Sequence, residues 1–119
     1  MSKTKDIKRT PGEVIERVAA ALRVLAHPHR LQIVERLMEA DLTVGELAEA
    51  LEIPPSACSQ HLNLMRAHGL LTGQRDGRAV HYRVTAPAAV NIIRCIHKHE
   101  LGGRPAVRAL GAPGGFGIV

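Results

Sequence analysis

Cysteine is too scarce in this sequence to build a disulfide framework, because the 119 residues contain only Cys58 and Cys95. A reducing, cytoplasmic setting is therefore the expectation. Apolar runs are also short, and none approaches the ~20 residues that a membrane-spanning helix needs. The first residues lack the apolar segment and cleavage site of a secretory signal. These absences predict a soluble protein with no membrane partner.

Arrangements of residues that would catalyse a reaction are also missing. No Ser/His/Asp set and no pair of carboxylates with a common role stands out, and a chain of this length forms one domain. An enzyme is therefore the least favoured class of protein. Positive charge is in excess, with a formal net charge of +5 and a pI of about 9.9. This balance suits a polyanionic partner such as nucleic acid.

Composition divides the chain into three parts. Residues 1–10 include four basic side chains and little to bury, which predicts a flexible basic arm. Residues 11–100 carry the periodic apolar pattern of one folded domain. Residues 101–119 hold six of the eleven glycines and two prolines, which predicts a disordered tail.

Apolar residues at helical spacing predict five helices in the domain. The first begins at Pro11 and ends before the histidines of the "HPH" segment, where His27 and His29 are expected to cap a helix or form a turn. The second covers about residues 30–40. The third starts with the capping-box pair Thr43 and Glu46, and two prolines then separate it from a fourth. The fifth covers about residues 87–100.

The fourth helix and the hairpin after it carry the most informative pattern. Cys58, Leu62 and Met65 share one face and are expected to be buried. On another face, four uncharged hydrogen-bonding side chains are spaced at i, i+3, i+4 and i+7. We call them the polar stripe: Ser56, Ser59, Gln60 and Asn63. Such side chains can bond to base edges in the major groove.

Period-two segments at 70–75 and 78–84 flank Asp76-Gly77, which predicts a β-hairpin with this pair as its turn. The predicted fold class is therefore mainly α with a small β-hairpin, a winged helix-turn-helix. Basic or polar side chains near the stripe and on the hairpin are expected to contact the DNA backbone: His61, Arg66, Arg75 and Arg78. The competing interpretation is a polar face exposed only to solvent.

Several linked motifs resemble the ArsR-type (ArsR/SmtB) family of winged helix-turn-helix transcriptional repressors. They are "LRVLAHPHRLQIVERL", "LTVGELAEAL", and "SACSQHLNLMRAHGLL" followed by "GRAVHYRV". The resemblance implies a bacterial repressor that forms a homodimer through its first and last helices and binds a pseudo-palindromic double-stranded DNA operator. It also implies DNA contacts at Ser56, Ser59 and Gln60.

The inducer sites known in that family are incomplete in this chain. The third-helix thiol pair has no counterpart in "DLTVGELA". Residues 85–88 offer no zinc ligand where the fifth-helix site requires some, and Glu35 and Leu101 occupy the positions of the family's paired sensor cysteines. The resemblance therefore leaves the inducing signal open.

Two sensing hypotheses remain. A metal site for Zn, Ni or Cu, with ligands shared across the dimer, would use the side chains of "CIHKHE": Cys95, His97, His99 and Glu100. A redox sensor would use Cys95, or else Cys58, for which packing is the simpler interpretation. A third outcome is that neither sensing mode exists.

The whole sequence thus favours a sequence-specific repressor. The main alternative is a winged helix that serves only as a protein-interaction module, since a fold alone does not define a function. The basic hairpin and the uncharged stripe favour the repressor.

Overall fold

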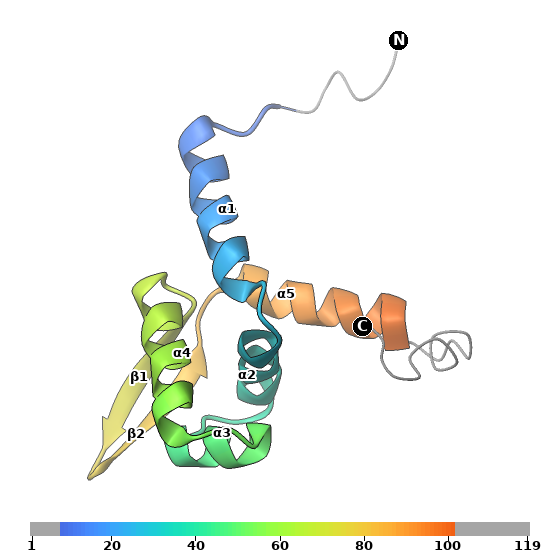
Figure 1. Cartoon of the computed structure of the whole chain (residues 1–119). Helices are drawn as coiled ribbons and strands as arrows, with labels where there is room; N and C mark the ends of the chain where they lie inside the picture. Colours follow the sequence, from blue (N-terminus) through green and yellow to red (C-terminus); the bar gives the residue numbers. More distant parts are fainter. Residues whose placement is uncertain (1–7, 102–119) are drawn as a thin grey trace.

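Five α-helices and one β-hairpin follow one another in the computed structural model, which describes residues 8–101 (Figure 1). The elements are α1 (Gly12–Leu25), α2 (Pro28–Glu39), α3 (Val44–Leu51), α4 (Pro55–Ala67), β1 (Leu71–Asp76), β2 (Ala79–Val84) and α5 (Pro87–Ile96), followed by a π-helical turn, η2 (His97–Leu101). The predicted tail beyond Leu101 and residues 1–7 of the predicted arm lie outside the described residues. The predicted fold, a winged helix-turn-helix, is confirmed.

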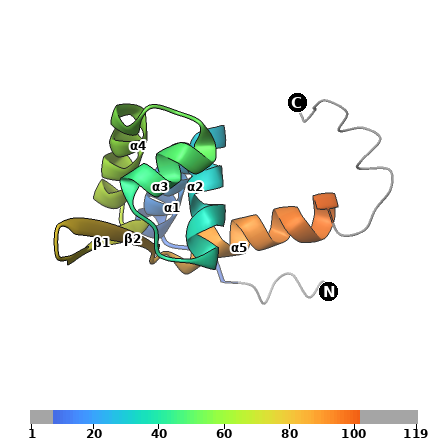
Figure 2. The same ribbon diagram turned by 90° about the horizontal axis from the view of Figure 1, so that it is seen from below.

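The core forms where α2, α3 and α4 converge. Ile33 of α2, Leu47 of α3 and Leu62 of α4 are completely buried, because each lies on the apolar stripe of its helix. Figure 2 shows α5 extending from one side of this body while the hairpin projects from the other. Among the described helices, none has both the length and the apolar character needed to cross a membrane.

The helix-turn-helix unit is defined by local signals that the sequence carries. Thr43 Oγ1 accepts a hydrogen bond from the Glu46 amide at 3.2 Å, and Glu46 Oε1 accepts one from the Thr43 amide at 2.9 Å, so the predicted capping box is confirmed. Helix α3 ends at Leu51, and the capping residue Glu52 that follows has a φ of 59°, in the left-handed region. The next helix, α4, begins at Pro55, where the missing amide costs no helical hydrogen bond. These signals set the sharp turn between α3 and α4.

The hairpin turn lies one residue later than the sequence pattern predicted. Asp76 pairs with Ala79, so the two-residue loop is Gly77-Arg78 rather than Asp76-Gly77. Gly77 has a φ of 68°, while Arg78 has no positive φ. This combination matches a type II′ turn, which requires a glycine only at its first central position. The shift places Arg78 at the tip of the wing.

Two long-range contacts attach the hairpin and the C-terminal turn to the body of the domain. The backbone of Leu42 pairs with that of Tyr82 and holds β2 beside the start of α3. At the C-terminal turn, His97 Nε2 lies 2.6 Å from Glu35 Oε2 and connects η2 to α2. The predicted fifth helix, residues 87–100, is α-helical only as far as Ile96, and the π-helical turn that follows begins at His97, the residue that makes this contact.

Candidate nucleic-acid interface

Helix α4 separates its apolar and polar side chains as the sequence predicted. Cys58, Leu62 and Met65 are fully buried against the core. In the polar stripe, Ser56, Gln60 and Asn63 are exposed and Ser59 is half-buried. An exposed row of hydroxyl and amide groups on one helix is available to bond to another molecule. Contacts of the stripe with bases remain a prediction.

The one formal charge on α4 itself is positive. Helix α4 contains no acidic residue, and Arg66 in its last turn is exposed, with its Nη2 at a long 3.5 Å from Asn63 Oδ1. Arg75 and Arg78 are exposed on the hairpin, beside the exposed carboxylate of Asp76. Phosphate groups would therefore meet exposed guanidinium groups at both the end of α4 and the tip of the wing.

A third arginine of the wing is already engaged within the chain. Arg83 Nη2 lies 2.8 Å from Asp41 Oδ2, and both side chains are exposed. The hydrogen bond from Arg83 is the main reason why the pKa of Asp41 is lower than its ordinary value. Exposed pairs of this kind add little stability. This contact, which the sequence pattern did not reveal, makes Arg83 a less available phosphate ligand than Arg75 or Arg78.

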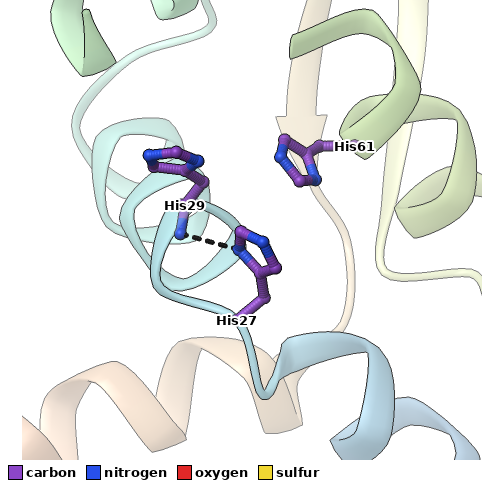
Figure 3. A group of neighbouring side chains, drawn as sticks. All are labelled: His27, His29 and His61. Atoms are coloured by element: carbon purple, nitrogen blue, oxygen red, sulfur yellow. Dashed lines mark hydrogen bonds between the residues drawn. The ribbon is translucent and has the colours of Figure 1, made fainter. Parts of the chain in front are cut away.

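His61 does not extend freely from the edge of the polar stripe. Its side chain is half-buried, and its Nδ1 accepts a hydrogen bond from Arg30 Nε at 3.1 Å. The His61 ring lies 4.7 Å from the His27 ring, between centroids (Figure 3). This geometry favours an intramolecular role for His61, because its ring faces α2 and the residue before it. The expected contact of His61 with a DNA phosphate stays a prediction.

His27 caps α2, as the sequence predicted for the "HPH" segment. Its Nδ1 accepts a hydrogen bond from the His29 amide at 3.1 Å, and Pro28 supplies the first helical residue. Burial, followed by the charge of Arg30 and then His29, lowers the pKa of His27. Burial also lowers the pKa of His61, together with the charges of His27, Arg30 and His29. The neutral forms of these two rings are therefore favoured in the folded chain.

This grouping predicts that acid destabilises the protein. A histidine with a lowered pKa binds fewer protons in the folded chain than in the unfolded chain. Its contribution to the free energy of unfolding is therefore complete above the ordinary histidine pKa of about 6.5 and is lost as the pH falls below it. We expect the free energy of unfolding to fall as the pH is lowered from 7.5 to 5, and His61→Gln to make this fall with pH less steep. Urea titrations at several pH values measure the free energy of unfolding. His68→Gln, at an exposed position, is the control, and equal slopes in all three proteins would contradict the expectation.

The residues of the sensing hypotheses do not converge within one chain. Cys95, His97, His99 and Glu100 are all exposed, and His97 is paired with Glu35. In the part of the chain that the structure describes, the only group of three or more potential ligands consists of other residues. A metal site at residues 95–100 therefore remains a prediction that requires a second subunit.

The two cysteines differ in accessibility. Cys58 is completely buried, and this burial raises the pKa of its thiol, which disfavours the reactive thiolate. Its packing role thus has a structural basis. Cys95 is exposed, as the redox hypothesis requires.

An apolar face on α1 is exposed in the part of the chain that the structure describes. Ile15, Val18 and Leu22 are 54%, 49% and 47% exposed, although they lie at helical spacing on one side of the helix. They line a shallow groove with Thr10 and Ala19. Contiguous exposed apolar side chains of this kind are characteristic of interaction surfaces.

These features define the chain as a winged helix-turn-helix protein. A family model described as "Helix-turn-helix domain" matches residues 25–74. The chain is 35% identical over 77 residues to the transcriptional activator HlyU of Vibrio cholerae, across 65% of this chain and 71% of HlyU. The chain belongs to the ArsR/SmtB family of helix-turn-helix transcriptional regulators.

Similarity to other proteins agrees with this assignment. The HTH-type transcriptional repressor SmtB of Mycobacterium tuberculosis is 40% identical over 83 residues, which are 70% of this chain but only 62% of that repressor. The solved structure of V. cholerae HlyU superimposes with a TM-score of 0.69 at 31% identity, over 74% of this chain and 96% of HlyU. The family's members are generally regulators rather than enzymes.

Proposed function

We propose that this protein is a sequence-specific DNA-binding transcriptional repressor that is released from its operator by a signal not yet identified. The observation that carries the proposal is the polar stripe on α4, in which three of the four side chains are exposed, together with the exposed arginines of the wing. The repressor acts in the cytoplasm and catalyses no reaction. HlyU is named an activator and SmtB a repressor, and direct competition with polymerase for a promoter makes repression the simpler mode for a domain this small.

In the proposed complex, α4 enters the major groove of double-stranded DNA. Serine hydroxyls and the amides of Gln60 and Asn63 bond to base edges, and amides pair well with adenine. Arg66, Arg75 and Arg78 contact phosphates, which adds affinity without reading sequence. Helix α3 supports α4 from behind through Leu47 and the core. The short, uncharged side chains of the stripe allow the helix to approach the bases closely.

The proposed functional unit is a homodimer formed by α1 and α5. The exposed side chains Ile15, Val18 and Leu22 need a cover, and a second copy provides the same apolar face under two-fold symmetry. Two-fold symmetry then places the two α4 helices about one DNA turn apart, roughly 34 Å. The matching operator is pseudo-palindromic.

A protein-interaction module with the same fold is the competing function, and salt distinguishes the two. Displacing counterions from DNA makes affinity fall steeply as salt rises, by about 10³-fold or more between 50 and 200 mM for six or more phosphate contacts. The experiment first selects duplexes from a randomised library and then measures binding to them by fluorescence anisotropy. A failure to enrich any sequence, together with no binding at 50 mM salt, would reject the proposal.

The stripe predicts a specific effect of Gln60→Ala. Loss of a base contact should weaken binding to the selected duplex by about 1–3 kcal/mol, roughly 5- to 150-fold, with little change in binding to random DNA. Because Gln60 is exposed, the fold should be unaffected. Anisotropy titrations with both duplexes measure the difference.

Arg78→Ala is the matched comparison, since a phosphate contact does not depend on sequence. It should weaken binding to both duplexes by similar factors and lower the salt slope by about one unit per site. If Gln60→Ala leaves both affinities unchanged, the face assigned to base reading is wrong.

A further inference from the structure

Three imidazole rings from distant parts of the sequence meet beside α4. His27 and His29 come from the start of α2, and His61 reaches them from α4 (Figure 3). One ring nitrogen of each histidine lies within 4.8 Å of a ring nitrogen of the other two. We propose that these three rings bind a divalent transition metal ion of the Zn²⁺, Ni²⁺ or Cu²⁺ type and thereby fasten α4 to the start of α2.

The donor set suits these ions. Imidazole nitrogen is a preferred ligand of Zn²⁺, Ni²⁺ and Cu²⁺, and three rings leave a position for water. In a tetrahedral site with metal–nitrogen bonds of about 2.0 Å, the nitrogens lie about 3.3 Å apart. The ring nitrogens, which lie within 4.8 Å of one another, therefore have to approach by at most about 1.5 Å, which side-chain rotations can supply. All three rings are half-buried, so an ion can enter from solvent.

Metal binding would exchange two existing hydrogen bonds for ligand bonds. The Nδ1 atoms of His27 and His61 now accept from the His29 amide and from Arg30 Nε, so the proton of each neutral ring is on Nε2. A metal at Nε2 requires the proton on Nδ1, and a metal at Nδ1 uses the lone pair directly. In either case the Nδ1 atom can no longer accept its present hydrogen bond. The change from one neutral tautomer to the other releases no proton.

Arg30 affects both the affinity of the site for a metal ion and the connection between α2 and α4 once the ion is bound. Its positive charge next to the rings opposes a cation, so we expect weaker binding than at a closed thiolate site. Its Nη1 also donates to the Val24 carbonyl at 3.0 Å, which keeps the guanidinium anchored when His61 is withdrawn. The connection between α2 and α4 would then pass through the metal in place of the Arg30–His61 hydrogen bond.

His29→Ala is the sharpest test of the site. The imidazole of His29 makes no hydrogen bond among the described contacts, whereas its backbone amide, which the variant keeps, donates to the His27 cap. The substitution therefore removes one ligand while preserving both the cap and the Arg30–His61 bond. His61→Gln is the second variant, because glutamine can still accept from Arg30. Controls are His68→Ala, at an exposed histidine, and Cys95→Ser, which removes the thiol of the other proposed metal site.

Co²⁺ serves as a spectroscopic probe on the full, tag-free chain, and Zn²⁺ as its competitor. The parent protein should bind one Co²⁺ per chain, with the visible bands of four-coordination and no thiolate charge-transfer band in the near ultraviolet. His29→Ala and His61→Gln should bind at least roughly 100-fold more weakly, since losing a direct ligand costs more than losing a supporting group. Zn²⁺ should raise the Tm of the parent and of both controls, but not of His29→Ala.

Three results would overturn the proposal. The first is a parent protein that binds no Co²⁺ at millimolar concentration. The second is a spectrum that His29→Ala leaves unchanged. The third is a thiolate band that disappears in Cys95→Ser, which would place the metal at residues 95–100. None of these readouts depends on DNA binding, so the site and the proposed repressor function fail or stand independently.

Discussion

Replacing Leu22 with aspartate should convert the proposed dimer to a monomer and abolish specific operator binding. Leu22 is 47% exposed on the apolar face of α1, and two-fold symmetry would introduce a carboxylate in each subunit at the same interface. Burying an unpaired charge costs several kcal/mol, which exceeds what a modest interface can supply. A monomer presents a single α4, so affinity should fall toward the non-specific level, a loss on the order of 10³-fold or more.

Sedimentation at micromolar concentration measures the assembly, and anisotropy on the selected duplex measures the affinity. Arg17→Asp is the control, because Arg17 is exposed on a different side of α1. It adds the same charged group to the same helix and should leave a dimer. A Leu22→Asp protein that sediments as a dimer would show that this face is not the interface.

Truncation of Leu62 to alanine should cause one of the largest losses of stability among alanine substitutions in α4. Leu62 is 0% exposed, and its alanine variant leaves a cavity at the convergence of the helices. We expect the free energy of unfolding to fall by about 2–5 kcal/mol, which is a large fraction of the total for a domain of this size. DNA binding should weaken as a consequence, since α4 is held in place by this packing.

Leu64→Ala provides a matched control two residues away. Leu64 is 36% exposed, so the same chemical change should cost less than about 1 kcal/mol. Urea unfolding at one fixed protein concentration measures both variants, because a dimer's stability depends on concentration. Equal losses at the two positions would mean that α4 is not packed with Leu62 inward.

Much of the site was predictable because local patterns define it. The buried and exposed faces of α4 follow from the 3.6-residue period, which separates Leu62 from Gln60 on any straight helix. The capping box at Thr43 and the prolines before Ser56 mark where α3 and α4 begin. Neighbouring residues are sufficient for these features, so the helix-turn-helix could be predicted before any tertiary contact was known.

The hairpin shows where a local signal is ambiguous. Asp-Gly and Gly-X pairs both form two-residue turns, in different turn types. Pairing between the strands decides which is used, and the backbone contact between Leu42 and Tyr82 fixes β2 against the body. The loop therefore formed at Gly77-Arg78, one residue away from the predicted position.

By itself, then, the sequence determined the class of the fold, the polar stripe on α4 and the excess of positive charge, because each depends on residue type and spacing along one element. Only the tertiary structure decided the partners of the half-buried polar groups. His61 faces His27 and Arg30, and His97 faces Glu35, across sequence separations that no period describes. Such pairs depend on how helices cross, and the crossing is set by the packing of the whole core.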